Sequence, residues 1–170
     1  MGNLIKADAI TPAITNGQYL TFSLRGEYYA VTTSSVKEII EYGQLTKVPM
    51  MPASIRGVIN LRGAVVPVID LGARFGTEQT TIDRRSCIVI LEVNHSDNEL
   101  QVIGVVVDAV NEVLEIATDD IEPAPAFGAN IRTDFMLGMG IVGGRLVILL
   151  DVGKVLSVDE LAALSASAAL

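Results

Sequence analysis

The chain is poor in the residues on which much protein chemistry depends. Its 170 residues include one cysteine, Cys87, one histidine, His95, and no tryptophan. A single cysteine excludes an intramolecular disulfide. A structural zinc site needs four cysteine or histidine ligands, and a catalytic one usually needs two or three histidines. One copy of the chain therefore cannot assemble a zinc site of either kind, and we expect no metal, no cofactor and no catalytic residue.

The single histidine and the single cysteine each have an ordinary structural explanation. His95 lies in the turn-forming run Asn94–Asn98, between two apolar stretches, so an exposed loop is favoured over a place beside a nucleophile. Cys87 opens the apolar run 87–91 and is expected to be a small core residue rather than a reactive thiol.

Excess positive charge and long apolar runs are also missing. Lysine and arginine total 12 against 20 aspartates and glutamates, a net charge of −8, which argues against nucleic acid and anionic lipid surfaces as partners. Runs such as 102–107 and 146–150 are far shorter than a membrane span, and the N-terminal residues lack a signal-peptide core. We expect a cytoplasmic protein without direct membrane insertion.

Aliphatic residues dominate what is present. Half of the residues are hydrophobic but only 5% are aromatic, so valine, isoleucine, leucine and alanine must fill the core, which favours β-structure. Residues 1–17 mix polar and small types and predict a flexible arm. A single domain is expected over 18–156, beginning with strands in 19–31 joined by a tight turn at Arg25-Gly26.

Two short helices and a hairpin are expected in the rest of the first half. Val36–Glu41 has apolar residues at helical spacing and follows the capping candidates Ser34 and Ser35, which predicts a short helix. The segment 57–69 predicts a hairpin that turns at Arg62-Gly63, followed by a helical piece over 71–75 capped by Asp70. Pro67 cannot donate a ladder hydrogen bond, so its strand must be an edge or carry a bulge there.

The second half repeats this plan. At an offset of about 74 residues, the matched positions are Val31/Val105, Val36/Val110, Glu38/Glu112, Glu41/Glu115 and Pro49/Pro123. At an offset of about 81 residues, they are Gly57/Gly138, Gly63/Gly144, Val66/Val147, Asp70/Asp151 and Gly72/Gly153. The repeat predicts a second helix over 110–115, a second hairpin over 138–150, and a loop insertion between Pro123 and Gly138.

Each copy is close to the smallest size that folds alone. We therefore expect two small antiparallel barrels that share one continuous core, subdomain 1 at about 18–85 and subdomain 2 at about 86–156, with an exchange of strands between them left open. Residues 157–170 form a tail, in which Ser157 and Glu160 make a capping box for a terminal helix. Leu161 and Leu164 of that helix are expected to dock on the second barrel, or else to bind a partner.

One motif match is rejected. Gly138–Gly143 satisfies the G-x-G-x-x-G pattern of dinucleotide-binding sites, but that pattern requires a following helix whose N-terminus receives the pyrophosphate. Here an apolar strand, 146–150, is expected to follow, and Gly143-Gly144 stands where Arg62-Gly63 turns the first hairpin.

The segment 52–71, PASIRGVINLRGAVVPVIDL, closely resembles the signature of the CheW family, the coupling proteins of bacterial chemotaxis. Segments 36–39, 105–110 and 121–125 fit the same family, and the similarity runs from about Tyr19 to about Leu156. The resemblance implies a mainly all-β fold of two intertwined five-stranded SH3-like barrels, agreeing with the duplication.

The resemblance also implies a non-catalytic adaptor in signalling arrays. Its partners would be the cytoplasmic tip of chemoreceptors, the regulatory domain of a CheA-type histidine kinase and other CheW copies in array rings, which would recruit the protein to the inner face of the membrane. By resemblance, the receptor-binding residues are Val36, Glu38, Gly57, Asn60, Arg62 and Val110. The kinase-binding residues are expected on the first barrel, at Tyr28, Tyr29 and Val31.

Alternatives remain open at this point. Without the resemblance, Arg62 is favoured as a solvated turn residue. Glu38 can then be the outer face of a short helix, and Asn60 a hydrogen-bond partner of the local backbone. The same scaffold also serves non-flagellar pathways that control pili or a second messenger. A ligand-binding regulatory double barrel is a further alternative, which a deep pocket with convergent polar groups would favour.

Overall fold

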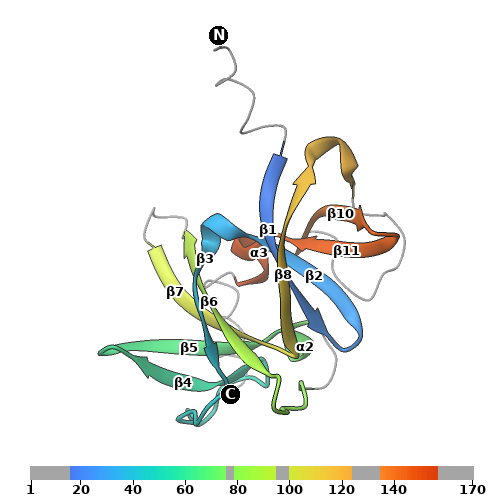
Figure 1. The fold of residues 1–170 in the computed structure, drawn as a ribbon. Helices are drawn as coiled ribbons and strands as arrows, with labels where there is room; N and C mark the ends of the chain where they lie inside the picture. The colour runs from blue at the N-terminus through green and yellow to red at the C-terminus, as the bar shows by residue number, and fades with distance from the viewer. Residues whose placement is uncertain (1–15, 76–78, 95–99, 124–134, 157–170) are drawn as a thin grey trace.

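The fold was determined as a computed structural model, which describes residues 16–75, 79–94, 100–123 and 135–156. It consists of two β-sheets with short helical turns at their ends (Figure 1), which confirms the expected mainly β fold. Sheet A has six strands, in the order β8 (Ala109–Ala117), β1 (Asn16–Leu24), β2 (Glu27–Thr32), β11 (Arg145–Leu150), β10 (Met136–Val142) and β9 (Ile121–Glu122). Sheet B has five, in the order β3 (Val36–Glu41), β6 (Cys87–Asn94), β7 (Leu100–Val107), β5 (Ala64–Asp70) and β4 (Ile55–Leu61).

Each sheet contains strands from both halves of the chain. Figure 1 shows the blue strands β1 and β2 beside the orange-red β10 and β11, whereas the green β4 and β5 lie with the yellow-green β6 and β7. The halves meet through two parallel pairs, β2 with β11 and β5 with β7, and through two antiparallel pairs, β1 with β8 and β3 with β6. Every other strand pair among the described residues is antiparallel. Neither half forms a complete sheet from its own strands.

The hairpins form where the sequence places them. The turns at Arg25-Gly26, Arg62-Gly63 and Gly143-Gly144 all have positive φ at both residues, as a two-residue hairpin turn of the primed type requires. Pro67 lies opposite Val58 of β4, and β5 pairs with β7 only from Val68 onward. The strand is therefore an edge at Pro67, one of the two arrangements its missing N–H allows.

Both aspartate caps are also confirmed. The side chain of Asp70 accepts a hydrogen bond from Ala73 N at the start of α2 (Leu71–Arg74), and that of Asp151 accepts one from Lys154 N at the start of α3 (Val152–Val155). The rejected glycine motif runs along β10 into its turn, and β11 follows instead of a helix.

Two of the predicted helices, 36–41 and 110–115, are wrong. Val36–Glu41 is strand β3, paired with β6, and 110–115 lies inside β8, paired with β1. Single 3-10 turns form beside them, at Thr33–Ser35 just before β3 and at Thr118–Asp120 just after β8. Six residues are too few to hold a helix without strong packing, and β-branched residues paired with a neighbouring strand favour the extended chain. Along β3, half-buried and exposed residues alternate strictly, so Val36 and Ile40 lie on the same side as Glu38, whereas Ile39 is exposed.

The core is divided into three clusters rather than being continuous. A central cluster lies between the sheets and draws residues from both, including Phe22, Val31, Ile69, Leu91 and Val105. Sheet A has a smaller cluster of its own, and so has sheet B: Tyr19, Ala30, Ile116, Val147 and Leu149 in A, and Val66, Val68, Ile88, Ile90 and Val106 in B. Successive residues of one strand point to opposite faces, so β1, β2, β5, β6, β7 and β11 each contribute to two clusters.

Four predictions fall wholly or partly outside the described residues. β1 begins at Asn16, earlier than the expected start of the domain, and the rest of the predicted arm, 1–15, lies outside them. The loop insertion within 124–133, the terminal helix and His95 also lie outside.

Cys87 is half-buried and packs against the central cluster, as expected of a small core residue. In the described part of the chain, no helix is long and apolar enough to cross a membrane.

Candidate functional site

Arg62 and Glu38 form an ion pair that joins the two edges of sheet B. Arg62 is the first residue of the β4–β5 turn, with φ +51°, and Glu38 lies on β3, at the opposite edge in strand order. Arg62 Nη1 donates to Glu38 Oε1 at 3.3 Å, and Arg62 Nη2 donates to Glu38 Oε2. The sheet therefore curls until its two edge strands meet, and a two-pronged charged contact spans the seam between them.

The ion pair is exposed and electrostatically coupled. The side chain of Arg62 is 66% exposed and that of Glu38 is 27% exposed. Hydrogen bonds from Arg62 hold the pKa of Glu38 below its ordinary value, and the same bonds raise the pKa of Arg62. Both side chains therefore stay charged at neutral pH and present a fixed guanidinium at the surface, a group suited to an acidic or amide partner.

Asn60 supports the turn that carries Arg62. Its Oδ1 accepts a hydrogen bond from Gly63 N at 2.8 Å. This is the contact with the local backbone that the sequence offers as an alternative to receptor binding. Because this bond fixes the residue after Arg62, Asn60 acts as a positioning residue for the guanidinium.

Val36 and Val110 flank the central cluster from the two sheets. Val36 begins β3 opposite Leu91, and Val110 lies on β8 opposite Phe22. Both are half-buried and pack against the central cluster. Val36 and Glu38 are both half-buried and lie on the same, more protected side of β3. The apolar Val36 therefore lies beside the Arg62–Glu38 ion pair.

Gly57 lies inside the seam and is buried. Its φ is +153°, and a Cβ built on it would lie 2.6 Å from the carbonyl oxygen of Thr46. That carbonyl accepts the hydrogen bond of Val58 N at 2.8 Å. The structure thus gives Gly57 a packing role, since only glycine lets the chain after β3 approach β4 so closely.

Of the three expected kinase-facing residues, only Tyr28 reaches the surface. Tyr29 and Val31 are 5% and 2% exposed and belong to the central cluster. Burial, with a smaller contribution from Glu27, raises the pKa of Tyr29 to about 12. Tyr28 is half-buried, and the guanidinium of Arg145 lies 4.2 Å from its ring centroid. Tyr29 and Val31 are too buried to contact a partner in this fold. Of the three residues expected to bind the kinase, Tyr28 is the one left with exposed surface.

A buried charge network next to the site was not recognised from the sequence. Asp70, fully buried, accepts hydrogen bonds from Arg56 Nη1 at 2.7 Å and from the backbone N and hydroxyl of Thr80 at 2.8 and 2.9 Å. Arg56 also donates to the Tyr42 hydroxyl at 3.2 Å. The network ties β4 to the chain after β3 and to the end of β5. The cap at Asp70 was a usable signal, but nothing in the sequence pattern points to Arg56.

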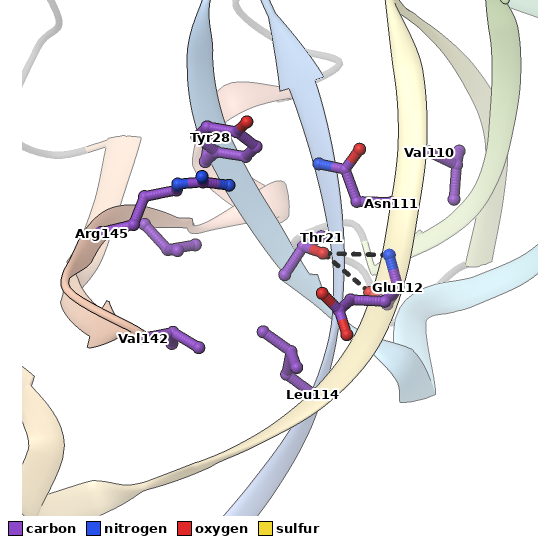
Figure 2. A pocket seen from close by; sticks show the side chains of 9 residues that line it. Thr21, Tyr28, Val110, Asn111, Glu112, Leu114, Val142 and Arg145 are labelled. Carbon is purple, nitrogen blue, oxygen red and sulfur yellow. Dashed lines mark hydrogen bonds between the residues drawn. The ribbon is translucent and has the colours of Figure 1, made fainter.

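Sheet A has a groove at the position that corresponds to the closed seam of sheet B (Figure 2). It has a volume of about 440 Å³ and lies between β8, the first two strands and the β10–β11 hairpin. Figure 2 shows Arg145 extended beside the ring of Tyr28 on one side, and Glu112 on β8 across from it. Thr21 braces β8 here, since its hydroxyl donates to Glu112 O at 2.8 Å and accepts from Glu112 N at 3.2 Å.

The comparisons with known proteins point to one family. The sequence model described as "CheW-like domain" matches residues 18–160. The chain is 34% identical to the "Chemotaxis protein CheW" of Klebsiella aerogenes over 95% of both chains, and 34% identical to that of Bacillus subtilis over 86% of this chain and 90% of the relative. It is 30% identical to "Protein FrzA" of Myxococcus xanthus, over 82% of this chain and 84% of that one.

A solved structure has the same fold. The crystal structure of the scaffolding protein TtCheW from Thermoanaerobacter tengcongensis aligns with a TM-score of 0.73 and 34% sequence identity, covering 82% of this chain and 86% of that chain.

Proposed function

Because the chain belongs to the CheW-like domain family, we propose that it is a non-catalytic adaptor that couples chemoreceptors to a CheA-type histidine kinase. The observation that carries the proposal is the family match over 18–160, which includes the Arg62–Glu38 pair held at the surface. The protein would act in the cytoplasm and reach the inner face of the membrane through receptor arrays, in which further copies of the chain would take part.

We assign receptor binding to the surface around the closed seam of sheet B. Arg62 and Glu38 supply its polar contacts, Asn60 holds the turn, and Val36 and Val110 supply apolar contacts at the edge of the central cluster. Gly57 contributes by allowing the close approach of two chain segments rather than by touching the receptor. A rigid charged fork beside apolar side chains suits the surface of a partner helix with acidic or amide groups.

Charge reversal at Arg62 tests this assignment. Arg62→Glu should keep the fold, since Arg62 is exposed, and should weaken binding of a receptor signalling-tip fragment by about 1 to 3 kcal/mol, the range of a moderate hot spot. Titration calorimetry measures the affinity, and circular dichroism checks the fold. Arg84→Glu, a charge reversal at an exposed residue outside the site, is the matched control. An unchanged affinity of the Arg62 variant contradicts the assignment.

A charge swap separates direct contact from positioning. In Arg62→Glu with Glu38→Arg, the pair across the seam can form again with its charges exchanged. If Arg62 touches the receptor, the swapped protein stays weak, because the partner meets the wrong charge. If Arg62 only closes the seam, the swap restores binding.

We place the kinase on sheet A, at Tyr28, rather than at the Arg62–Glu38 pair of sheet B. Val110 of the receptor-binding set lines the same groove as Tyr28, so the Arg62–Glu38 pair is what separates the two surfaces. Tyr28→Ala should reduce the affinity for the kinase regulatory domain while leaving that for the receptor fragment unchanged. The Arg62 variants should show the reverse pattern. Loss of both partners in both sets of variants would contradict a two-surface adaptor.

A further inference from the structure

The groove of Figure 2 is the second copy of the seam that Arg62 and Glu38 close. Gly57 and Gly138 each follow a register shift in their strand, and a Cβ on either would lie 2.6 Å from a backbone carbonyl oxygen, that of Thr46 or of Glu122. The hairpin turns at Arg62-Gly63 and Gly143-Gly144 share the same positive φ values within about 15° at each position. The two seams are therefore built alike in backbone.

The side chain that closes the first seam is missing from the second. Glu112 stands where the first copy has Glu38, but Gly143 stands where the first copy has Arg62. The second seam thus keeps the carboxylate and lacks the guanidinium. Sheet A also packs fewer half-buried apolar residues against its own cluster: Tyr28, Ile121 and Val142, compared with Ile40, Tyr42, Leu45, Ile59, Leu61, Ile82 and Val102 in sheet B.

Glu112 is exposed and fixed in place. The two hydrogen bonds between its backbone and Thr21 hold the irregular part of β8, where the pairing with β1 shifts register. Among the described residues, the carboxylate of Glu112 has no cation within 4.0 Å, the limit for an ion pair. Arg145, the cation that lines the same groove, is held over the ring of Tyr28 instead.

We propose that this groove is a docking site for an arginine side chain of a partner protein, whose guanidinium pairs with Glu112 as Arg62 pairs with Glu38 within the chain. The net charge of −8 favours a cationic partner group. Leu114, Val142 and Val147 line the groove and offer apolar surface to the methylene stem of an arginine. The first seam shows that a guanidinium fits this backbone geometry with two hydrogen bonds, which a lysine ammonium cannot reproduce.

Capped arginine tests the site without requiring the partner. Nα-acetyl-L-arginine methylamide is titrated into the ¹⁵N-labelled full chain, and the backbone amide shifts of Glu112, Gly143 and Gly144 are followed by NMR. We expect saturable shifts at these amides, and weaker binding of the capped lysine. Glu112→Gln should weaken binding of the arginine probe at least threefold, whereas Glu115→Gln, an exposed glutamate of the same strand, should not.

A glycine substitution provides an independent arm. Gly143→Arg restores the residue found at position 62, which adopts nearly the same backbone angle, so its own guanidinium should occupy Glu112 and abolish binding of the probe. Gly143→Ala controls for the loss of glycine and should bind as the unmodified chain does.

Four results would overturn the proposal. They are no saturable shift at the three amides, equal binding by Glu112→Gln, equal binding of capped lysine, and binding of free L-arginine without binding of the capped residue. The last result would mark a small-molecule site instead of a protein docking site.

Discussion

Asp70 and Asp151 occupy equivalent positions in the two hairpins, but among the residues that the structure describes only Asp70 is paired with an arginine. Asp70 is fully buried and accepts hydrogen bonds from Arg56, Thr80 and Ala73, whereas Asp151 is half-buried and accepts one from Lys154 N at 3.3 Å. In the second copy, Leu137 stands where the first has Arg56. The two equivalent aspartates thus both cap a helical turn, and Asp70 also neutralises the charge of Arg56.

Removing these two carboxylates should therefore have unequal effects. Asp70→Ala leaves Arg56 with its charge uncompensated and should lower the free energy of unfolding by about 3 to 5 kcal/mol. Asp151→Ala removes only a helix cap and should cost about 1 kcal/mol. Urea denaturation followed by circular dichroism measures both. Equal losses would show that the Arg56–Asp70 pair adds nothing beyond the cap.

The Arg62–Glu38 pair predicts a local pH dependence. Because Arg62 lowers the pKa of Glu38 below its ordinary value of 4.5, the pair stabilises the folded state at pH values above 4.5. That contribution is lost as the pH falls through the lowered folded-state pKa. NMR titration of the Glu38 side-chain carboxyl carbon should give a pKa below 4.5 in the unmodified chain, and one close to 4.5 in Arg62→Gln. An identical midpoint in both would mean that the pair does not form in solution.

At the scale of elements, the close approach at the seams depends on glycine. A methyl group on Gly57 would collide with Thr46 O, while one on Gly63 would meet open space. Both residues have positive φ, so alanine strains the backbone at either position, but only Gly57→Ala adds the collision.

Gly57→Ala should accordingly be the more damaging of the two substitutions. We expect a loss of about 2 to 4 kcal/mol for Gly57→Ala, and of about 1 kcal/mol for Gly63→Ala. For a chain of this length, each kcal/mol lowers Tm by about 2 to 4 °C, so differential scanning calorimetry resolves the two variants. Comparable Tm values would show that β4 moves away from Thr46 at little cost.

The sequence predicts turns and caps better than it predicts pairing. Gly-containing turns and the aspartate caps depend on local backbone geometry, so Arg62-Gly63 and Asp70 are recognisable without a fold. The segments 36–41 and 110–115 were assigned to the wrong element, because their extended form is stabilised by β6 and β1, which lie far away in the chain. The family resemblance alone indicates the Arg62–Glu38 pair, which joins the two edges of sheet B. Nothing in the sequence indicates Arg56–Asp70, which depends on how the neighbouring strands β4 and β5 align.

At the scale of the whole molecule, the exchange of strands makes the two halves depend on each other. The first two strands lie between β8 and β11 of the second half, and β6 and β7 lie between strands of the first. In a fragment of either half, the pair β1–β2 or the pair β6–β7 loses its neighbouring strands from the other half. Part of the central cluster is then exposed.

The fragments 1–85 and 86–170 should each lack a cooperative unfolding transition. Mixed together, they should regain one, because the missing strand pairs then form between chains. Thermal melts followed by circular dichroism, of each fragment and of an equimolar mixture, test this. A cooperative transition in either fragment alone would contradict the interdependence of the halves.

Receptor control of the kinase tests the central claim, that the chain couples one partner to the other. Autophosphorylation of a cognate CheA-type kinase is measured with a receptor signalling fragment, with and without the purified chain. The account predicts that kinase activity depends on the receptor only when the chain is present, and that Arg62→Glu removes this dependence while Arg84→Glu keeps it. Receptor dependence that is the same with and without the chain, across cognate partners, would contradict the coupling role.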